Sequence, residues 1–172
     1  ENKVAIVTGG SRGIGYATVE KFIKEGAKVC LTASSEASAE KAVGKLKEAY
    51  PNADIMGIAP TLSSLESVQA EFAKVVEKYG RIDILINNAG MSESTPLSAY
   101  TEELYDKVID LNVKGVFTCS KVAADYMEKQ HSGVIINASS IVSITGQPAG
   151  FAYPASKFAV NGMTLSMARE LG

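Results

Sequence analysis

Short apolar runs and longer amphipathic stretches alternate along the chain. The apolar runs cover residues 4–7, 29–31, 55–58, 82–86 and 134–137. After each run, apolar residues recur every three or four positions, which is the spacing of one face of a helix. We therefore expect five strands that alternate with helices. This alternation, with crossovers of such length, predicts an α/β fold with a doubly wound parallel sheet in the strand order 3-2-1-4-5.

The last two helical patterns are longer, and the fifth strand between them has no predicted neighbour on one side. The helical patterns cover residues 101–130, with Gly115 as a candidate break, and residues 155–171. The strand at 134–137 would be an exposed apolar edge, which soluble proteins normally avoid. We therefore expect residues 1–172 to be one domain that lacks later strands at its C-terminal end, or a domain whose edge a partner covers.

Composition and charge narrow the class of protein. Of the 172 residues, 46% are hydrophobic and 21% are charged, which is ordinary for one soluble domain. The net charge is −2, with 17 basic and 19 acidic residues mixed along the chain, so we expect no binding to nucleic acid or to a membrane. No run reaches the roughly 18 uninterrupted apolar residues of a membrane span. The sequence predicts a cytoplasmic protein.

Cysteine and histidine are not expected to supply the chemistry. Cys30 and Cys119 lie within apolar patterns and lack the spacing of metal ligands, so we expect reduced core residues and no metal site. His131 stands in a Gln-His-Ser-Gly sequence that is typical of a surface turn. The reactive groups are therefore expected among other side chains.

A glycine-rich turn joins the first predicted strand to the first predicted helix. It reads Thr-Gly-Gly-Ser-Arg-Gly-Ile-Gly over residues 8–15. In Rossmann-type folds this position places the pyrophosphate of a dinucleotide on unpaired N–H groups of the helix. Gly9 would permit the tight turn, Gly13 the close approach of a phosphate, and Gly15 the close packing of helix on strand. The alternative is a plain strand-to-helix turn.

The end of the second strand favours NADP(H) over NAD(H). Folds that bind NAD usually carry an acidic residue there to hold the ribose 2′-hydroxyl. This chain reads Leu-Thr-Ala-Ser-Ser at 31–35, with no acidic residue before Glu36. A 2′-phosphate would meet no repulsion, and Arg12 and Ser34 could bind it. The alternative is that Arg12 is solvated and that Glu36 only favours the start of a helix.

Tyr153 and Lys157 are four positions apart at the start of the last helix, so their side chains share one face. An ammonium group beside a phenol makes the phenolic proton easier to release, as general acid-base catalysis near neutral pH requires. Such a pair alone is common on helix surfaces. Here Ser140 follows the fifth strand, and ligands of open parallel sheets bind beyond the carboxyl ends of the strands. Ser140 could hold the substrate oxygen or be an ordinary strand-end hydroxyl.

Taken together, these motifs resemble the short-chain dehydrogenase/reductase family. They are TGxxxGxG at 8–15, Asn-Asn-Ala-Gly at 87–90, Asn112 in Leu-Asn-Val, Ser140, and Tyr-Pro-Ala-Ser-Lys at 153–157. Their order and separations are similar to those of the family, and the resemblance covers essentially the whole chain. It implies an enzyme that moves hydride between a nicotinamide cofactor and a carbonyl or secondary alcohol carbon.

The resemblance also implies roles for single residues. Tyr153 resembles the general acid of carbonyl reduction, and Ser140 the residue that positions the substrate oxygen. Lys157 resembles the group that makes the tyrosine more acidic while binding the nicotinamide ribose, and Asn112 the asparagine that holds a water of the proton relay. The implied cofactor contacts are Gly9, Ser11, Arg12, Gly13, Ile14, Gly15, Ser34, Asn88, Ala89, Gly90, Tyr153 and Lys157. One departure is Thr61, which stands where the family commonly has an acidic residue at the adenine edge.

Several readings of the substrate follow from the resemblance. The main prediction is a 3-oxoacyl-[acyl-carrier-protein] reductase-like enzyme, and the alternative is a hydroxysteroid dehydrogenase of the kind that acts on bile acids, which residues 46–51 and 57–60 also resemble. The loops at 91–96 and 141–151 carry apolar residues that suit an apolar or elongated carbonyl substrate. A catalytically idle NADP(H)-binding sensor or scaffold is the alternative of another class. The two long helices imply a homodimer or homotetramer.

Overall fold

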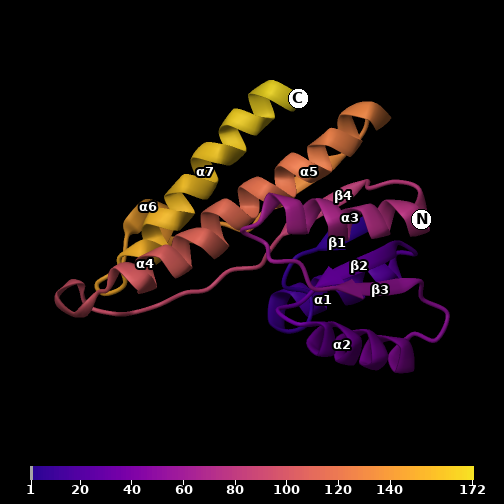
Figure 1. Cartoon of the computed structure of the whole chain (residues 1–172), viewed down its shortest axis with the longest axis horizontal. Coiled ribbons are helices and arrows are strands. Elements are labelled where there is room, and N and C mark those ends of the chain that lie inside the picture. Colours follow the sequence, from indigo (N-terminus) through magenta and orange to yellow (C-terminus); the bar gives the residue numbers. More distant parts are fainter. Residues whose placement is uncertain (1) are drawn as a thin grey trace.

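Five parallel strands form one sheet in the computed structural model, which describes residues 2–172 (Figure 1). Their order is β3-β2-β1-β4-β5, and every pair of neighbours is parallel. The strands are β1 (Val4–Val7), β2 (Lys28–Thr32), β3 (Ile55–Ile58), β4 (Ile84–Asn87) and β5 (Val134–Asn137). This topology confirms the predicted α/β fold of the Rossmann type and its strand order.

Helices cover both faces of the sheet (Figure 1). On one face, α1 (Gly13–Lys24) and α2 (Glu36–Ala49) pack against side chains of β1, β2 and β3. On the other face, α3 (Leu65–Tyr79) and α5 (Gly115–Gln130) enclose a second core around Phe72 and Leu85. The whole of β1 is buried, which explains why its sequence is continuously apolar rather than alternating.

The predicted long helix over residues 101–130 is divided into three parts. After α4 (Glu102–Ile109), a π-helical turn (Asp110–Lys114) leads into α5. The turn comes before Gly115, the residue at which a break was predicted, and it places Asn112 in the interior, where this residue has no exposed surface. Single π-helical turns within α-helices are frequent at functional sites.

Two of the element boundaries that differ from the prediction have an identifiable cause. Strand β4 begins at Ile84 rather than at Ile82, because the side chain of Gln130 donates to the Ile82 carbonyl at 2.7 Å and accepts from its N–H at 3.1 Å. Helix α7 (Ala152–Leu171) begins three residues before position 155, because proline is tolerated in the first turn of a helix. The short helix α6 (Val142–Thr145) and a 3-10 turn at Leu97–Ala99 were not predicted.

Strand β5 is an edge strand with an apolar, half-exposed surface, as the strand order led us to expect. The side chains of Val134 and Ile136 are each about half exposed. Of the helices within residues 2–172, none is both long and apolar enough to cross a membrane.

The cysteines and the histidine lie as the sequence predicted. Cys30 and Cys119 are free and buried, and burial raises the pKa of the Cys119 thiol to about 12. His131 is exposed and forms the left-handed C-cap of α5. Both cysteines are therefore protonated core residues at neutral pH.

Candidate active site

The glycine turn between β1 and α1 contains positions that favour glycine over any other residue. Gly9 and Gly13 have φ angles of +65° and +57°, in the left-handed region that favours glycine. A methyl group on Gly15 would overlap the carbonyl oxygen of Gly9 and would lie 2.6 Å from Nδ2 of Asn88. Around Gly13, by contrast, the space is open. The turn is closed on its inner side and accessible on its outer side.

Helix α1 begins without a side-chain cap. Its N-cap residue, Arg12, makes no capping hydrogen bond, whereas Ser35, Ser64 and Thr101 cap α2, α3 and α4 through their hydroxyl groups. The first N–H groups of α1 are therefore free of a side-chain partner at the open side of the glycine turn. This is the arrangement in which a helix binds a phosphate.

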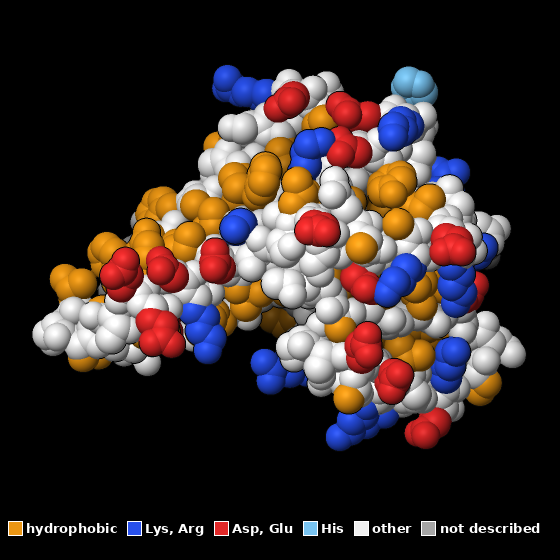
Figure 2. All heavy atoms as spheres, viewed as in Figure 1, with side chains coloured by type: hydrophobic (Ala, Val, Ile, Leu, Met, Phe, Trp, Pro, Cys, Tyr) orange, Lys and Arg blue, Asp and Glu red, His pale blue; other side chains and the backbone are white. Residues whose placement is uncertain are grey.

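The turn opens into a cleft of about 1210 Å³ at the carboxyl ends of the strands. In Figure 2 the surface is hollowed between the arm that carries α4 and the lobe formed by α1 and α2. Ten of the residues predicted to contact the cofactor line the cleft, and they are Gly9, Ser11, Arg12, Gly13, Ile14, Gly15, Ser34, Asn88, Ala89 and Gly90. The remaining two, Tyr153 and Lys157, lie beyond the Gly90 end of the cleft.

The residues after β4 are tied to the glycine turn. The hydroxyl of Thr8 accepts hydrogen bonds from the N–H groups of Asn88 and Ala89, each at 3.0 Å. The amide of Asn88 donates to the Thr8 carbonyl at 3.0 Å. These contacts fix the position of Gly90 relative to the cleft.

Lys157 and Tyr153 share one face of α7, as predicted. The Lys157 side chain is only 6% exposed, its ammonium group donates to the carbonyl of Ala138 at 2.7 Å, and Nζ lies 5.8 Å from the centre of the Tyr153 ring. Burial lowers the pKa of Lys157 below its ordinary value. Negative charge on a neighbouring oxygen is therefore favourable beside this buried cation.

Asn112 connects the π-helical turn to the same region. Its amide accepts from the N–H of Met91 and donates to the Met91 carbonyl, both at 2.9 Å, and it donates to Oγ of Ser156 at 3.0 Å. A methyl group placed on Gly90 would lie 3.2 Å from Oδ1 of Asn112 and 3.8 Å from Nζ of Lys157. The structure thus brings Gly90, Asn112 and Lys157 together at the end of the cleft.

Ser140 lies after β5, two residues beyond the carbonyl that Lys157 holds. The segment around it is fixed by Asn161, which sequence reasoning missed. Asn161 accepts from the Ser139 hydroxyl at 2.6 Å and donates to Oγ of Ser143 at 2.9 Å, while Ser143 donates to the Ser140 carbonyl at 2.6 Å. The available signal was that Asn161 follows Lys157 by one helical turn on the same helix face.

Arg12, Ser34 and Thr61 also line the cleft. Arg12 and Ser34 are exposed, as a pair that binds a phosphate at the rim would be. The N–H of Thr61 donates to Oγ of Ser67 at 2.9 Å, and its hydroxyl makes no hydrogen bond within residues 2–172. Thr61 is therefore near the nucleotide cleft and supplies no carboxylate there.

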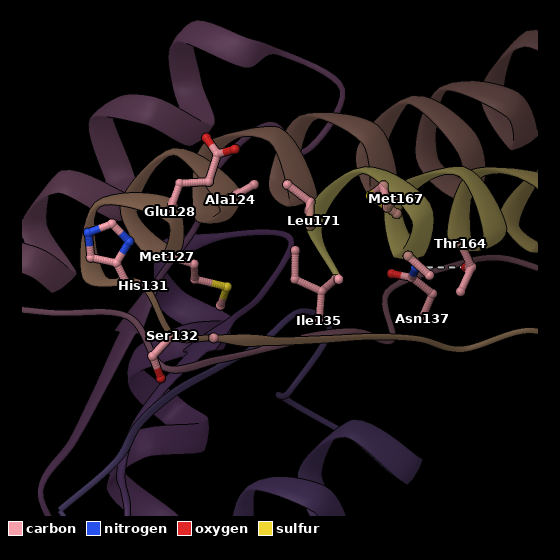
Figure 3. Close-up of a pocket in the computed structure, with 13 residues that line it drawn as sticks. Ala124, Met127, Glu128, His131, Ser132, Ile135, Asn137, Thr164, Met167 and Leu171 are labelled. Atoms are coloured by element: carbon pink, nitrogen blue, oxygen red, sulfur yellow. Dashed lines mark hydrogen bonds between the residues drawn. The ribbon is translucent and has the colours of Figure 1, made fainter.

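A second hollow, of about 800 Å³, runs along β5 between α5 and α7 (Figure 3). Met127 from α5, Ile135 from β5 and Leu171 from α7 line it, and His131 is at its rim. Of the five strands only β5 lines this hollow, from Ile135 to Asn137, and none of the four predicted catalytic residues lines it. Over residues 2–172, no cluster of three or more histidine, cysteine, aspartate or glutamate side chains could hold a metal ion.

The sheet is of the Rossmann type and has a nucleotide-sized cleft at its carboxyl ends, with a Tyr-x-x-x-Lys pair beside the cleft. These features are those of an NAD(P)-dependent oxidoreductase that acts on CH–OH groups. The chain belongs to the short-chain dehydrogenase family, because the sequence model of that family, described as "short chain dehydrogenase", matches residues 3–172. This confirms the resemblance found in the motifs.

Named relatives narrow the comparison. The chain is 55% identical over 172 residues to a 3alpha-hydroxysteroid dehydrogenase of Mediterraneibacter gnavus, with 100% of the chain and 69% of the relative covered. It is 40% identical over 171 residues to the 3-oxoacyl-[acyl-carrier-protein] reductase FabG of Thermotoga maritima, with 99% and 69% covered. A crystal structure of NAD+-bound xylitol dehydrogenase matches with a TM-score of 0.94 at 31% identity, over 99% of this chain and 65% of that one. The chain thus spans about two thirds of the length of these proteins.

Proposed function

We propose that this chain carries the cofactor-binding and catalytic residues of an NADP(H)-preferring hydroxysteroid dehydrogenase, which interconverts a ring hydroxyl and a ketone. The observation that carries the proposal is the convergence of Tyr153, Lys157 and Asn112 at the Gly90 end of the cleft. A bound nicotinamide cofactor would supply or accept the hydride. The chain's own residues bind the cofactor and the substrate, orient the substrate oxygen and exchange its proton.

Each of the four side chains has one task in this proposal. The Tyr153 hydroxyl donates a proton to the substrate oxygen during reduction and takes it back during oxidation. Ser140 donates a hydrogen bond that orients the same oxygen, and the Lys157 ammonium group favours the negative charge that develops there. Asn112 binds the main chain of Met91 and the hydroxyl of Ser156, which fixes the loop after β4 and helix α7 relative to the π-helical turn.

The residues of the cleft fit a dinucleotide. A side chain at Gly15 would collide with the turn, the space around Gly13 is open, and α1 has no side-chain cap, so its N–H groups would bind the pyrophosphate. Asn88, Ala89 and Gly90 would line the central part. The exposed Arg12 and Ser34, together with the lack of an acidic residue at the end of β2, support NADP(H) over NAD(H).

The substrate class is where the sequence-based ranking changes. The main prediction was a 3-oxoacyl-[acyl-carrier-protein] reductase, but the 55% identity to a hydroxysteroid dehydrogenase exceeds the 40% identity to the reductase and favours the alternative. The side chains of Ile141, Ile144 and Phe151 are 68%, 72% and 54% exposed on the segments that adjoin Ser140 and Tyr153. Such a group of exposed apolar residues fits a rigid apolar substrate such as a steroid.

Assembly into a homodimer or homotetramer is part of the proposal. Phe117 of α5 and Phe158 and Leu165 of α7 are at least half exposed, so both long helices carry large apolar side chains that a second copy of the chain could cover. Light scattering on the full-length protein tests this point, and a monomer at micromolar concentration would refute it.

The substrate assignment is tested by measuring NADPH oxidation by the full-length protein with two ketones, a 3-oxo steroid and a 3-oxoacyl thioester. We expect a higher kcat/KM for the steroid. A clear preference for the thioester would restore the first-ranked prediction. The absence of turnover with either ketone, in a protein that binds NADPH, would support the idle sensor instead.

A further inference from the structure

Helix α7 carries Tyr153 in its first turn, yet its own N-cap residue cannot hold that turn. The N-cap is Phe151, whose side chain has no acceptor for a backbone N–H group. The first N–H groups of a helix need partners from elsewhere when no side chain of the helix supplies them. Two other segments of the chain supply them here.

One partner is the carboxylate of Glu93, in the loop that follows β4. Its Oε1 accepts a hydrogen bond from the N–H of Tyr153 at 3.2 Å. The second partner is the hydroxyl of Tyr100, which accepts from the N–H of Ala152 at 3.3 Å. A carboxylate at a helix N-terminus also interacts favourably with the helix dipole, so Glu93 is the stronger of the two.

Other hydrogen bonds orient the Glu93 carboxylate and hold its main chain in place. Its Oε2 accepts from the N–H of Thr95 at 3.0 Å, and its carbonyl accepts from the side-chain amide of Gln147 at 3.0 Å. The N–H of Gly150 donates to the Thr95 carbonyl at 2.9 Å. The loop after β4 is thereby joined to the segment that enters α7.

The same loop is anchored at its other end to the catalytic region. The N–H of Met91, two residues before Glu93, donates to the side-chain amide of Asn112, and the Met91 carbonyl accepts from it. The loop therefore spans from the buried asparagine to the main chain of Tyr153. A shift of Glu93 would therefore move the first turn of α7 relative to Asn112.

We propose that Glu93 is a positioning residue, which caps α7 from another segment and thereby sets the position of the Tyr153 phenol. This inference rests on the proposed role of Tyr153. Glu93 acts through Tyr153 and not on the substrate. A displacement of about 1 Å at a reacting group can cost about 100-fold in rate, so a single hydrogen bond at this place has kinetic consequences.

The test compares Glu93→Ala, Glu93→Gln and a matched control in the full-length protein. The control is Glu66→Ala, because Glu66 is a carboxylate in the first turn of α3 and does not line the cleft. We expect Glu93→Ala to lower kcat for the ketone by between about 10- and 100-fold, with the NADPH dissociation constant unchanged. Glu93→Gln keeps one acceptor oxygen and should recover part of the loss, while Glu66→Ala should match the wild type.

Two further measurements separate positioning from general stability. In a Tyr153→Phe background, Glu93→Ala should cause no additional loss of kcat, because its effect passes through the phenol. Hydrogen exchange should become faster in the first turn of α7 in Glu93→Ala and should stay unchanged there in Glu66→Ala. Wild-type kcat in Glu93→Ala, an additive loss in the double variant, or unchanged exchange would each overturn the inference. A wild-type protein that turns over no ketone would instead refute the proposed function, and the exchange result would still decide the capping contact.

Discussion

The glycine turn gives a sharp test of cofactor binding, because a single methyl group at Gly15 has no room. An added Cβ would overlap the Gly9 carbonyl oxygen and would lie 2.6 Å from Asn88 Nδ2 and 2.9 Å from the Gly9 carbonyl carbon. Two of these atoms belong to the backbone, so they cannot rotate away. The Gly15→Ala variant must therefore displace the turn or the start of α1.

The size of the effect follows from the cost of overpacking. Forcing a methylene into a closely packed site costs about 1–3 kcal/mol. If the cofactor requires the undisturbed turn, the dissociation constant of NADPH should rise about 10- to 100-fold, since each 1.4 kcal/mol corresponds to about a tenfold change. Fluorescence titration of NADPH measures this constant directly.

Gly44→Ala is the matched control for this variant. Gly44 lies within α2, and a methyl group there would meet nothing within 4 Å. Because alanine is the better helix former, this control should gain about 0.5–1 kcal/mol in stability and bind NADPH as the wild type does. If Gly15→Ala bound NADPH with unchanged affinity, the turn would not be the pyrophosphate site.

Two further predictions concern charge. Burial alone would raise the pKa of Asp83, but hydrogen bonds from Arg81 and from the Val4 N–H outweigh it and hold the pKa below its usual value. Asp83 therefore contributes stability that is present above the unfolded-state pKa of about 3.9 and is lost as the pH falls through the lower folded-state value. Asp83→Asn should lower the free energy of unfolding by about 1–3 kcal/mol at pH 7 and should reduce its dependence on pH in urea melts from pH 7 to 2.5. An unaltered pH dependence would show that Asp83 does not contribute. Arg12→Ala should raise the KM for NADPH about tenfold or more and leave that for NADH nearly unchanged, and equal effects on both cofactors would argue against 2′-phosphate binding.

The sequence predicted those features that depend on short stretches of chain. The apolar run of β1 is buried on both faces, so its composition alone identifies a central parallel strand. The helical spacing of Tyr153 and Lys157 places them on one face whatever the rest of the chain does. Gly9 has a positive φ angle, which agrees with the tight turn predicted at this residue.

Features that depend on contacts between distant segments were not predictable in this way. The start of β4 is decided by Gln130, which lies 48 positions after Ile82. The first turn of α7 depends on Glu93, which lies 60 positions before Tyr153. Neither contact leaves a periodic pattern in the sequence. The sequence motifs also did not decide between the two candidate ketones, because the loops that adjoin Ser140 carry apolar residues that suit both.

The proposed mechanism requires that the Tyr153 phenol exchange the proton of the substrate oxygen. Replacing it in Tyr153→Phe keeps the ring and removes only the hydroxyl, so the fold and the nucleotide cleft should be preserved. The most direct measurement is the kcat of this variant for NADPH-dependent reduction of the 3-oxo steroid, together with its NADPH dissociation constant. We predict a loss of about 100- to 10,000-fold in kcat with unchanged NADPH binding. Near-normal turnover in Tyr153→Phe would contradict the mechanism.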